Sequence, residues 1–168
     1  MGSPTYIPLA TWTASNSSST SVDFQSIPAT MRDIVVIVNA KSSDASTERN
    51  LFYRFNADTT GANYFGVDAY AYASGFTSSS FNALPDIVYM PRSGDAMAIA
   101  TMQIFDYSAT DKHKTLLRRF NTEGSPTDLA GMGAHRWANT SALNRITFYT
   151  TTGAIAQGST ISLYGIAG

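Results

Sequence analysis

Residues 145–168 read RITFYTTTGAIAQGSTISLYGIAG, and they carry the clearest strand signals in the sequence. Ile146 and Phe148 alternate with Thr and Tyr side chains, and Ile161 and Leu163 alternate with Ser and Tyr. This period of two is typical of a half-buried strand. Glycines at positions 153 and 158 predict a turn between the two stretches. We therefore expect residues 160–166 to be a strand inserted in a sheet rather than a tail.

Similar alternation recurs between polar breaks along the chain, whereas helical patterns are weak. The one candidate for a helical turn, residues 134–144, contains Thr, Ser and Asn, which disfavour helix. Regularly spaced strand signals predict a single all-β domain over residues 1–168, an antiparallel β-sandwich of the jelly-roll type. The expected strands are residues 6–13, 21–25, 33–40, 51–56, 64–71, 86–90, 96–107, 115–121, 130–138, 145–151 and 160–166. The expected loops are residues 16–21, 42–50, 74–80 and 122–128, of which the Gly/Ser-rich residues 74–80 should be a mobile surface loop.

Composition restricts the classes of partner. Only 14% of the residues are charged, so the surface must consist largely of hydroxyl and amide side chains, and the net charge is −1. The densest basic group is Lys112, Lys114, Arg118 and Arg119, which we expect on a solvated loop and strand face rather than on nucleic acid. Cysteine is absent, which excludes disulfides and thiolate chemistry and suits synthesis in a reducing cytoplasm. Neither a membrane span nor a signal peptide is indicated.

Two predicted strands are apolar on both faces. Residues 34–38 read IVVIV, and residues 97–105 read MAIATMQIF. A strand of this kind is covered on both sides. In a sandwich, the second face must be covered by the chain's own loops or by a neighbouring subunit, and the sequence leaves both alternatives open.

No motif nominates a catalytic, cofactor-binding or metal-binding residue. The only histidines are His113, in a charged turn, and His135, and we interpret both as surface or hydrogen-bonded structural residues. No Gly-x-Ser-x-Gly motif occurs, and the carboxylates are scattered without a pair that would suggest a glycosidase. We therefore expect a protein that is not an enzyme and that needs no cofactor.

Residues 56–61, NADTTG, resemble the first half of a calcium-binding loop. The twelfth position would be Val67, where such a loop requires a bidentate Glu. A hairpin turn in which Asn56 and Asp58 accept backbone hydrogen bonds and Gly61 adopts a positive φ explains the same residues, and we prefer it.

Aromatic residues gather near the Gly/Ser-rich loop, at Tyr64, Phe65, Tyr70, Tyr72 and Phe76. Strands favour such residues for core and interface packing, which is our first interpretation. Exposed tyrosines can also stack on sugars, which is the alternative.

Several segments, in order along nearly the whole chain, resemble a family of small phage virion structural proteins that includes capsid decoration proteins and tail-protein β-sandwich modules. Met31 stands where this family usually has an aromatic residue. The resemblance implies a structural role in the virion after synthesis in the host cytoplasm. The segments are IPATMRD at 27–33, YRFNAD at 53–58, TTGANY at 59–64, DYS at 106–108, KT at 114–115, Trp137 with NRIT at 144–147, and GSTISLYGI at 158–166.

The first functional interpretation is a capsid decoration (cement) protein. By the resemblance, it would bind the major capsid protein as a homotrimer and clamp neighbouring capsid subunits. No coiled coil or shaft-like repeat is present, which argues against a complete tail fibre. The alternative is a receptor-binding or glycan-binding module of a tail fibre or tail tip that contacts a host surface glycan. A glycan hydrolase is a third hypothesis.

Overall fold

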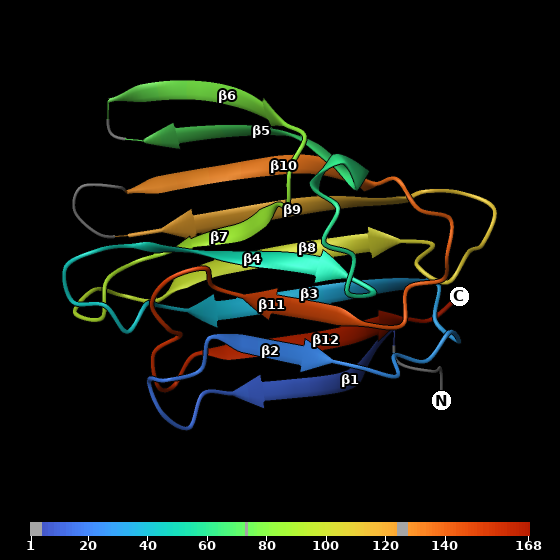
Figure 1. Ribbon diagram of the computed structural model, residues 1–168, viewed down its shortest axis with the longest axis horizontal. Helices are drawn as coiled ribbons and strands as arrows, with labels where there is room; N and C mark the ends of the chain where they lie inside the picture. Colours follow the sequence, from blue (N-terminus) through green and yellow to red (C-terminus); the bar gives the residue numbers. More distant parts are fainter. Residues whose placement is uncertain (1–4, 73, 124–127) are drawn as a thin grey trace.

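The protein is described here by a computed structural model that covers residues 5–72, 74–123 and 128–168. It is all-β: an eight-stranded antiparallel sheet, in the order β1-β12-β3-β8-β9-β10-β5-β6, packs against a four-stranded sheet, in the order β2-β11-β4-β7 (Figure 1). The strands are β1 (Tyr6–Thr13), β2 (Ser21–Phe24), β3 (Asp33–Ala40), β4 (Arg49–Phe55), β5 (Tyr64–Tyr72), β6 (Gly75–Phe81), β7 (Asp86–Met90), β8 (Ala98–Phe105), β9 (Lys114–Thr122), β10 (Leu129–Trp137), β11 (Ile146–Tyr149) and β12 (Thr160–Ile166). A 3-10 helix, η1 (Gly61–Asn63), precedes β5.

Strands from opposite ends of the chain pair with one another. β1 pairs with β12 and β2 with β11, while β5 pairs with β10, β3 with β8 and β4 with β7. This pairing of strands distant in the chain, with the chain passing repeatedly between the two sheets, is the jelly-roll arrangement that the sequence predicts. The predicted fold class is therefore confirmed.

Alternation along the strands builds the core between the sheets. Ile34, Val36 and Val38 of β3 are completely buried, as are Leu51, Tyr53 and Phe55 of β4 on the facing sheet. Ile161 and Leu163 of β12 join the same cluster. Each such side chain contributes roughly 1.5–3 kcal/mol on burial. Strand β12 is an internal strand next to the edge of the sheet, between β1 and β3, so its predicted insertion in a sheet is confirmed.

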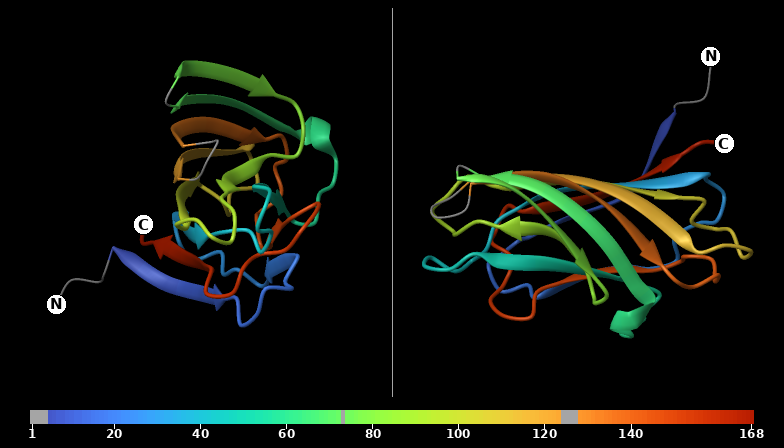
Figure 2. Two further views of the ribbon diagram at one scale, coloured as in Figure 1. Left: turned by 90° about the vertical axis from the view of Figure 1, so that its left-hand side faces the viewer. Right: turned by 90° about the horizontal axis from the view of Figure 1, so that it is seen from above.

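The large sheet extends beyond the small one. Edge strand β7 of the small sheet packs against β8 and β9, so that β10, β5 and β6 project past its edge. Figure 2 shows this projection as the curved upper part of the large sheet, with β6 at its margin. We call these three strands, together with the neighbouring strand β9, the overhang.

Three sequence-based predictions need correction or completion. Residues 74–80, expected to be a mobile loop, mostly belong to β6, which pairs with β5 in continuous register from Gly75 to Phe81. Its serines predicted a loop, but strand pairing uses the backbone N–H and C=O groups, which every non-proline residue has. The candidate helical turn at 134–144, which its residue types disfavour, does not form, because β10 continues to Trp137 and residues 138–144 are irregular. Of the expected loop at 122–128, residues 124–127 lie outside the described residues, and Thr122 ends β9.

The outer face of the large sheet is unusually apolar. Ile37 of β3 and Ile99 of β8 are 41% and 49% exposed, and Leu117 of β9 and Met132 of β10 are 54% and 62% exposed. The chain's own loops therefore leave most of the second face of β3 and β8 exposed. Val35 of β3 is an exception on this face, because it is buried. Of the two alternatives for these strands, cover by the chain itself is wrong for Ile37 and Ile99.

Within the described ranges, no helix has the length and apolar character that spanning a bilayer requires.

Candidate functional site

A pocket of about 880 Å³ lies between the overhang and the edge of the small sheet. Strands β5, β6, β9 and β10 supply one side of it, and β4, β7 and the segment before β7 supply the other. Its lining combines aromatic rings with polar and charged groups. The residues are Asn50, Phe52, Asp68, Tyr70, Tyr72, Ser74, Ser79, Phe81, Leu84, Pro85, Asp86, Tyr89, Arg118, Phe120, Asp128 and Leu129.

Strand alternation and two glycines position the side chains of the overhang. Asp68, Tyr70 and Tyr72 occupy every second position of β5 and so face the pocket together. Between β5 and β9, strand β10 places Gly133 opposite Asp68 and Arg118, and Gly131 opposite Tyr70 and Phe120. A Cβ at Gly133 would lie 1.8 Å from Asp68 Oδ1, and one at Gly131 would lie 2.7 Å from Phe120 and from Tyr70. The glycines therefore allow side chains of β5 and β9 to meet across β10.

Arg118 and two aspartates form the floor of the pocket. Arg118 Nε and Nη2 donate to Asp68 Oδ1 and Oδ2 at 3.0 and 2.8 Å, which is a bidentate ion pair. Arg118 Nη1 donates to the carboxylate and the backbone carbonyl of Asp86, both at 2.8 Å. The guanidinium also lies 4.5 Å from the ring centre of Phe120. Because Asp68 belongs to the large sheet and Asp86 to the small one, Arg118 connects the two.

His135 extends this network into the core. Its Nε2 lies 2.9 Å from Asp68 Oδ1, and its Nδ1 lies 2.8 Å from the hydroxyl of Tyr53. A carboxylate only accepts, so Nε2 carries the proton, and the Tyr53 hydroxyl donates to Nδ1. This pattern satisfies a neutral imidazole completely.

Burial and hydrogen bonding set the charges of this network. Burial lowers the pKa of His135, and the hydrogen bond to Asp68 opposes this shift without reversing it. Burial alone would raise the pKa of Asp68, but hydrogen bonds from His135 and Arg118 lower it by more. Asp68 is therefore an anion beside a neutral imidazole at neutral pH.

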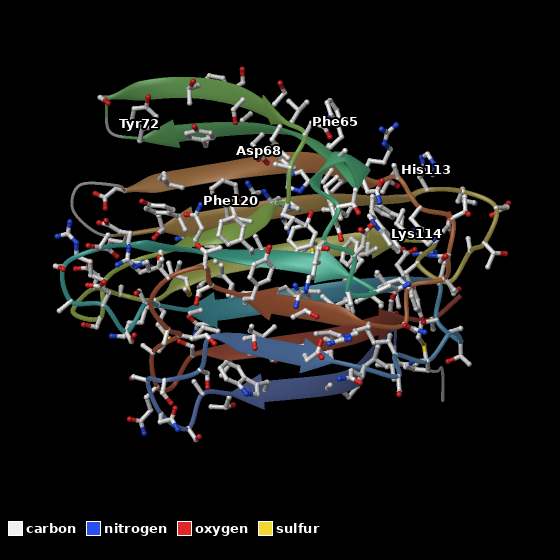
Figure 3. The ribbon with its side chains drawn as sticks, in the orientation of Figure 1. Phe65, Asp68, Tyr72, His113, Lys114 and Phe120 are labelled. Atoms are coloured by element: carbon white, nitrogen blue, oxygen red, sulfur yellow. The ribbon has the colours of Figure 1, made fainter. Side chains whose placement is uncertain are left out.

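Aromatic rings form the walls. Tyr70 and Tyr72 are neighbours, with ring centres 6.2 Å apart and planes tilted by 40°. Phe52 of β4 and Tyr89 of β7 line the opposite side. Tyr72 is 43% exposed, so part of its ring is open to a ligand. In Figure 3, Tyr72, Asp68 and Phe120 lie on the overhang, whereas His113 and Lys114 lie at the other end of β9.

The basic group predicted to be solvated is split by strand alternation. Lys112 and Arg119 are exposed, but Lys114 and Arg118 are buried, so the prediction is wrong for these two. Lys114 Nζ donates to three backbone carbonyls, those of Ala109, Lys112 and Thr140. Burial lowers the pKa of Lys114. Its role in the structure is to tie the β8–β9 loop to the chain before β11.

The histidines differ in their surroundings. His135 is the hydrogen-bonded structural residue that the sequence analysis describes, whereas His113 is exposed on the loop before β9. His135 lies opposite Leu116 of β9, three residues beyond His113, so the difference is one of burial, and neither histidine lines the pocket.

Residues 56–61 form a turn, as expected, but the predicted hairpin is wrong, because the turn connects β4 of the small sheet to β5 of the large sheet. Asn56 and Ala57 have φ of 47° and 59°, whereas Gly61 has no positive φ and opens η1. The Asn56 amide oxygen accepts from the backbone N–H groups of Asn144 and Arg145. Asp58 accepts from the backbone N–H of Thr60 and from the side chains of Asn63 and Trp137. In the part of the chain that the structure describes, no three His, Cys, Asp or Glu side chains gather as a metal-binding group.

The predicted aromatic cluster is divided among three environments. Tyr64 is buried, and its hydroxyl donates to Asp58 O and accepts from the backbone N–H of Phe55. Tyr70 and Tyr72 line the pocket. Phe65 and Phe76, 44% and 72% exposed, lie away from it. The packing interpretation is therefore confirmed for Tyr64, whereas stacking of the pocket tyrosines on a sugar stays a prediction.

The sequence analysis did not identify Asp68, Asp86 or Arg118 as site residues. The available signal was the Gly131-Met132-Gly133 sequence within an otherwise regular strand. Glycine inside a strand often marks a close approach of neighbouring groups. The glycines do not indicate which groups approach one another, because β5, β7 and β9 are far apart in the chain.

No protein-family model and no curated protein matches the chain. Among solved structures, it is similar to the carbohydrate-binding module (CBM40) of a Ruminococcus gnavus sialidase. With α2,3-sialyllactose bound, that module is 8% identical with a TM-score of 0.37, and the match covers 94% of this chain and 91% of that chain. With α2,6-sialyllactose bound, it is 9% identical with a TM-score of 0.37, covering 94% and 92%. TM-scores below 0.5 carry no argument about what this chain binds.

Proposed function

We propose that the protein is a non-catalytic carbohydrate-binding β-sandwich that holds a glycan in the pocket beneath the overhang. The observation that supports this most directly is the lining itself, which places tyrosine and phenylalanine rings next to carboxylate, amide and hydroxyl groups. On a virion, as the resemblance to phage proteins implies, such a module would bind a host surface glycan as part of a tail fibre or tail tip.

A sugar ring presents apolar C–H faces and a rim of hydroxyls, and the pocket offers partners for both. Tyr70, Tyr72 and Tyr89 supply rings for the apolar faces. The partly exposed carboxylate of Asp86 supplies oxygen acceptors for the hydroxyls. A mostly apolar pocket with a few convergent polar groups is the usual form of a small-ligand site.

The floor is arranged for binding rather than for hydrolysis. A glycosidase needs one carboxylic acid that remains protonated to serve as the general acid. The pKa of Asp68 is lowered, and both its oxygens accept hydrogen bonds from Arg118 or His135. Asp68 is therefore unsuited to donate a proton to a leaving group.

The test is a glycan-binding screen with the purified protein, followed by calorimetry on the oligosaccharides that bind. Tyr72→Ala and Tyr89→Ala should each weaken binding by about tenfold, equivalent to about 1.4 kcal/mol. Phe76→Ala is the matched control, because Phe76 is an exposed ring on the same β5–β6 hairpin that does not line the pocket.

Failure of every oligosaccharide to bind would contradict the proposal. Binding that survives Tyr72→Ala and Tyr89→Ala but is lost in Phe76→Ala would place the ligand elsewhere and would also contradict it. Release of shortened sugars by the protein would refute the non-catalytic part.

Capsid decoration is the second candidate, and the apolar outer face of the large sheet supports it. Ile37, Ile99, Leu117 and Met132 would be suited to a protein interface. Counting copies per particle by immunogold labelling or quantitative mass spectrometry of purified virions distinguishes the two. Hundreds of copies would support decoration of the head, whereas a few would support a tail module.

A further inference from the structure

We infer that the pocket selects uncharged glycans and discriminates against sialylated or uronate-containing ones. This inference rests on the proposed function, and it specifies the ligand class of the same site. It follows from the way in which the charges of the pocket are already paired.

Carboxylates outnumber cations in the lining. Among the described residues that line the pocket, Arg118 is the one basic residue, and it faces two carboxylates, those of Asp68 and Asp86. An anionic ligand would therefore enter a pocket whose fixed charge has the same sign. Like charges repel most strongly where the surroundings exclude water.

The basic residue is not available to a ligand carboxylate. Recognition of a carboxylate by arginine depends on two parallel N–H···O bonds. In Arg118, Nε and Nη2 already form such a pair with Asp68, and Nη1 donates to Asp86. The side chain is only 5% exposed, and Phe120 lies against it. A ligand carboxylate would have to displace Asp68, which His135 also holds.

The polar group of the floor that a ligand can still reach is a hydrogen-bond acceptor, which suits a hydroxyl donor. The Asp86 side chain is 27% exposed, and its Oδ1 accepts a hydrogen bond from Arg118. A carboxylate is an acceptor only, and a sugar hydroxyl can donate to it in a short, charge-assisted hydrogen bond. Asp86 therefore favours a neutral polyhydroxyl ligand and opposes an anion at the same position.

The experiment compares matched pairs of oligosaccharides by calorimetry. Each neutral oligosaccharide that binds is compared with the same chain after oxidation of its C6 hydroxymethyl groups to carboxylates, and lactose is compared with 3′-sialyllactose. The neutral member should bind at least about tenfold more tightly. Raising the salt concentration should leave neutral binding unchanged and improve uronate binding, because salt screens repulsion.

Asp86→Asn provides an internal check. The amide oxygen can still accept from Arg118, but the negative charge is removed, so the ratio between neutral and uronate affinities should fall by at least about threefold. If this variant does not fold, the ratio of neutral to uronate affinity measured for the unsubstituted protein still tests the inference.

Equal or tighter binding of the acidic members would overturn the inference while leaving glycan binding intact. Absence of binding by every neutral and acidic oligosaccharide would instead overturn the proposed function and the inference with it. The two failures are therefore distinguishable.

Discussion

At the residue scale, the same side chains form the floor of the pocket and join the two sheets. Asp68, Arg118 and His135 come from the large sheet, and Tyr53 and Asp86 from the small one. Asp68 is central, because its two oxygens accept from both Arg118 and His135. Removing one partner from a buried ion pair usually costs about 3–5 kcal/mol, since the other charge is left unpaired. Binding and stability are therefore coupled through Asp68.

The first prediction concerns pH. Because the pKa of His135 is lowered in the folded protein, the unfolded chain binds more protons once the pH falls below about 6.5. The free energy of unfolding should therefore decrease as the pH falls from about 6.5 towards the folded-state pKa. Asp68 adds a further loss of stability below the ordinary aspartate pKa of 3.8, because its pKa is also lowered on folding.

Thermal unfolding between pH 7.5 and 5 tests this dependence. His135→Gln should lower Tm at pH 7.5, because the imidazole ring that packs against Tyr53 and Phe81 is lost, but it should flatten the change in Tm with pH. His113→Gln, at the exposed histidine, is the control. A variant at position 135 that retained the full pH dependence would show that another group is responsible.

The second prediction concerns Gly133. An alanine Cβ there would lie 1.8 Å from Asp68 Oδ1 and 2.9 Å from His135 Nε2, so the network must rearrange. Gly133→Ala should reduce the free energy of unfolding by about 1–3 kcal/mol, as overpacking usually does. Gly94→Ala is the matched control, since no atom lies within 4 Å of its added Cβ. Urea unfolding curves of both variants provide the measurement, and equal stabilities would refute the close approach.

At the scale of elements, sequence patterns predicted most strands because alternation is a local property. The strands at Tyr6–Thr13, Asp33–Ala40, Asp86–Met90 and Thr160–Ile166 match their predicted limits. β6 was missed because its serines carry no hydrophobic signal, and its place depends on pairing with β5. The pocket was not predictable for a similar reason: it forms where β5, β7 and β9 meet, and single-sequence patterns do not encode which strands become neighbours.

The third prediction concerns β12. Leu163 is 1% exposed within the core, so Leu163→Ala should reduce the free energy of unfolding by about 2–5 kcal/mol. Ser162→Ala in the same strand should have little effect, because its hydroxyl only accepts an exposed hydrogen bond from Thr11. Deleting residues 160–168 should yield insoluble protein, since β1 and β3 would both lose their partner. An unchanged Tm for Leu163→Ala or for the deletion would contradict the placement of β12 between β1 and β3.

At the scale of the whole molecule, the large sheet presents two different faces. The inner face carries the core and, beneath the overhang, the polar floor of the pocket. The outer face carries the exposed Ile37, Ile99, Leu117 and Met132. Because the pocket and the apolar face lie on opposite sides of the large sheet, the proposed glycan binding and an assembly through the outer face would not compete.

The fourth prediction concerns assembly. If the outer face is an interface, as the resemblance to trimeric decoration proteins implies, light scattering at micromolar concentration should give about three times the chain mass of 18.0 kDa. Leu117→Lys should shift the protein to monomer. Arg119→Glu, at an exposed residue on the same face, is the control that tests whether a change of charge alone has this effect. A monomer at all concentrations would contradict the trimer in solution.

The central claim is that a glycan binds beneath the overhang, and amide chemical-shift mapping tests it most directly. Titration with a neutral oligosaccharide selected by the screen should shift the amide signals of Asp68, Tyr70, Asp86 and Phe120 together, with a single dissociation constant. Signals of Ile37 and Leu117 on the outer face should not move. Shifts confined to the outer face, or no shifts at saturating oligosaccharide, would contradict the account.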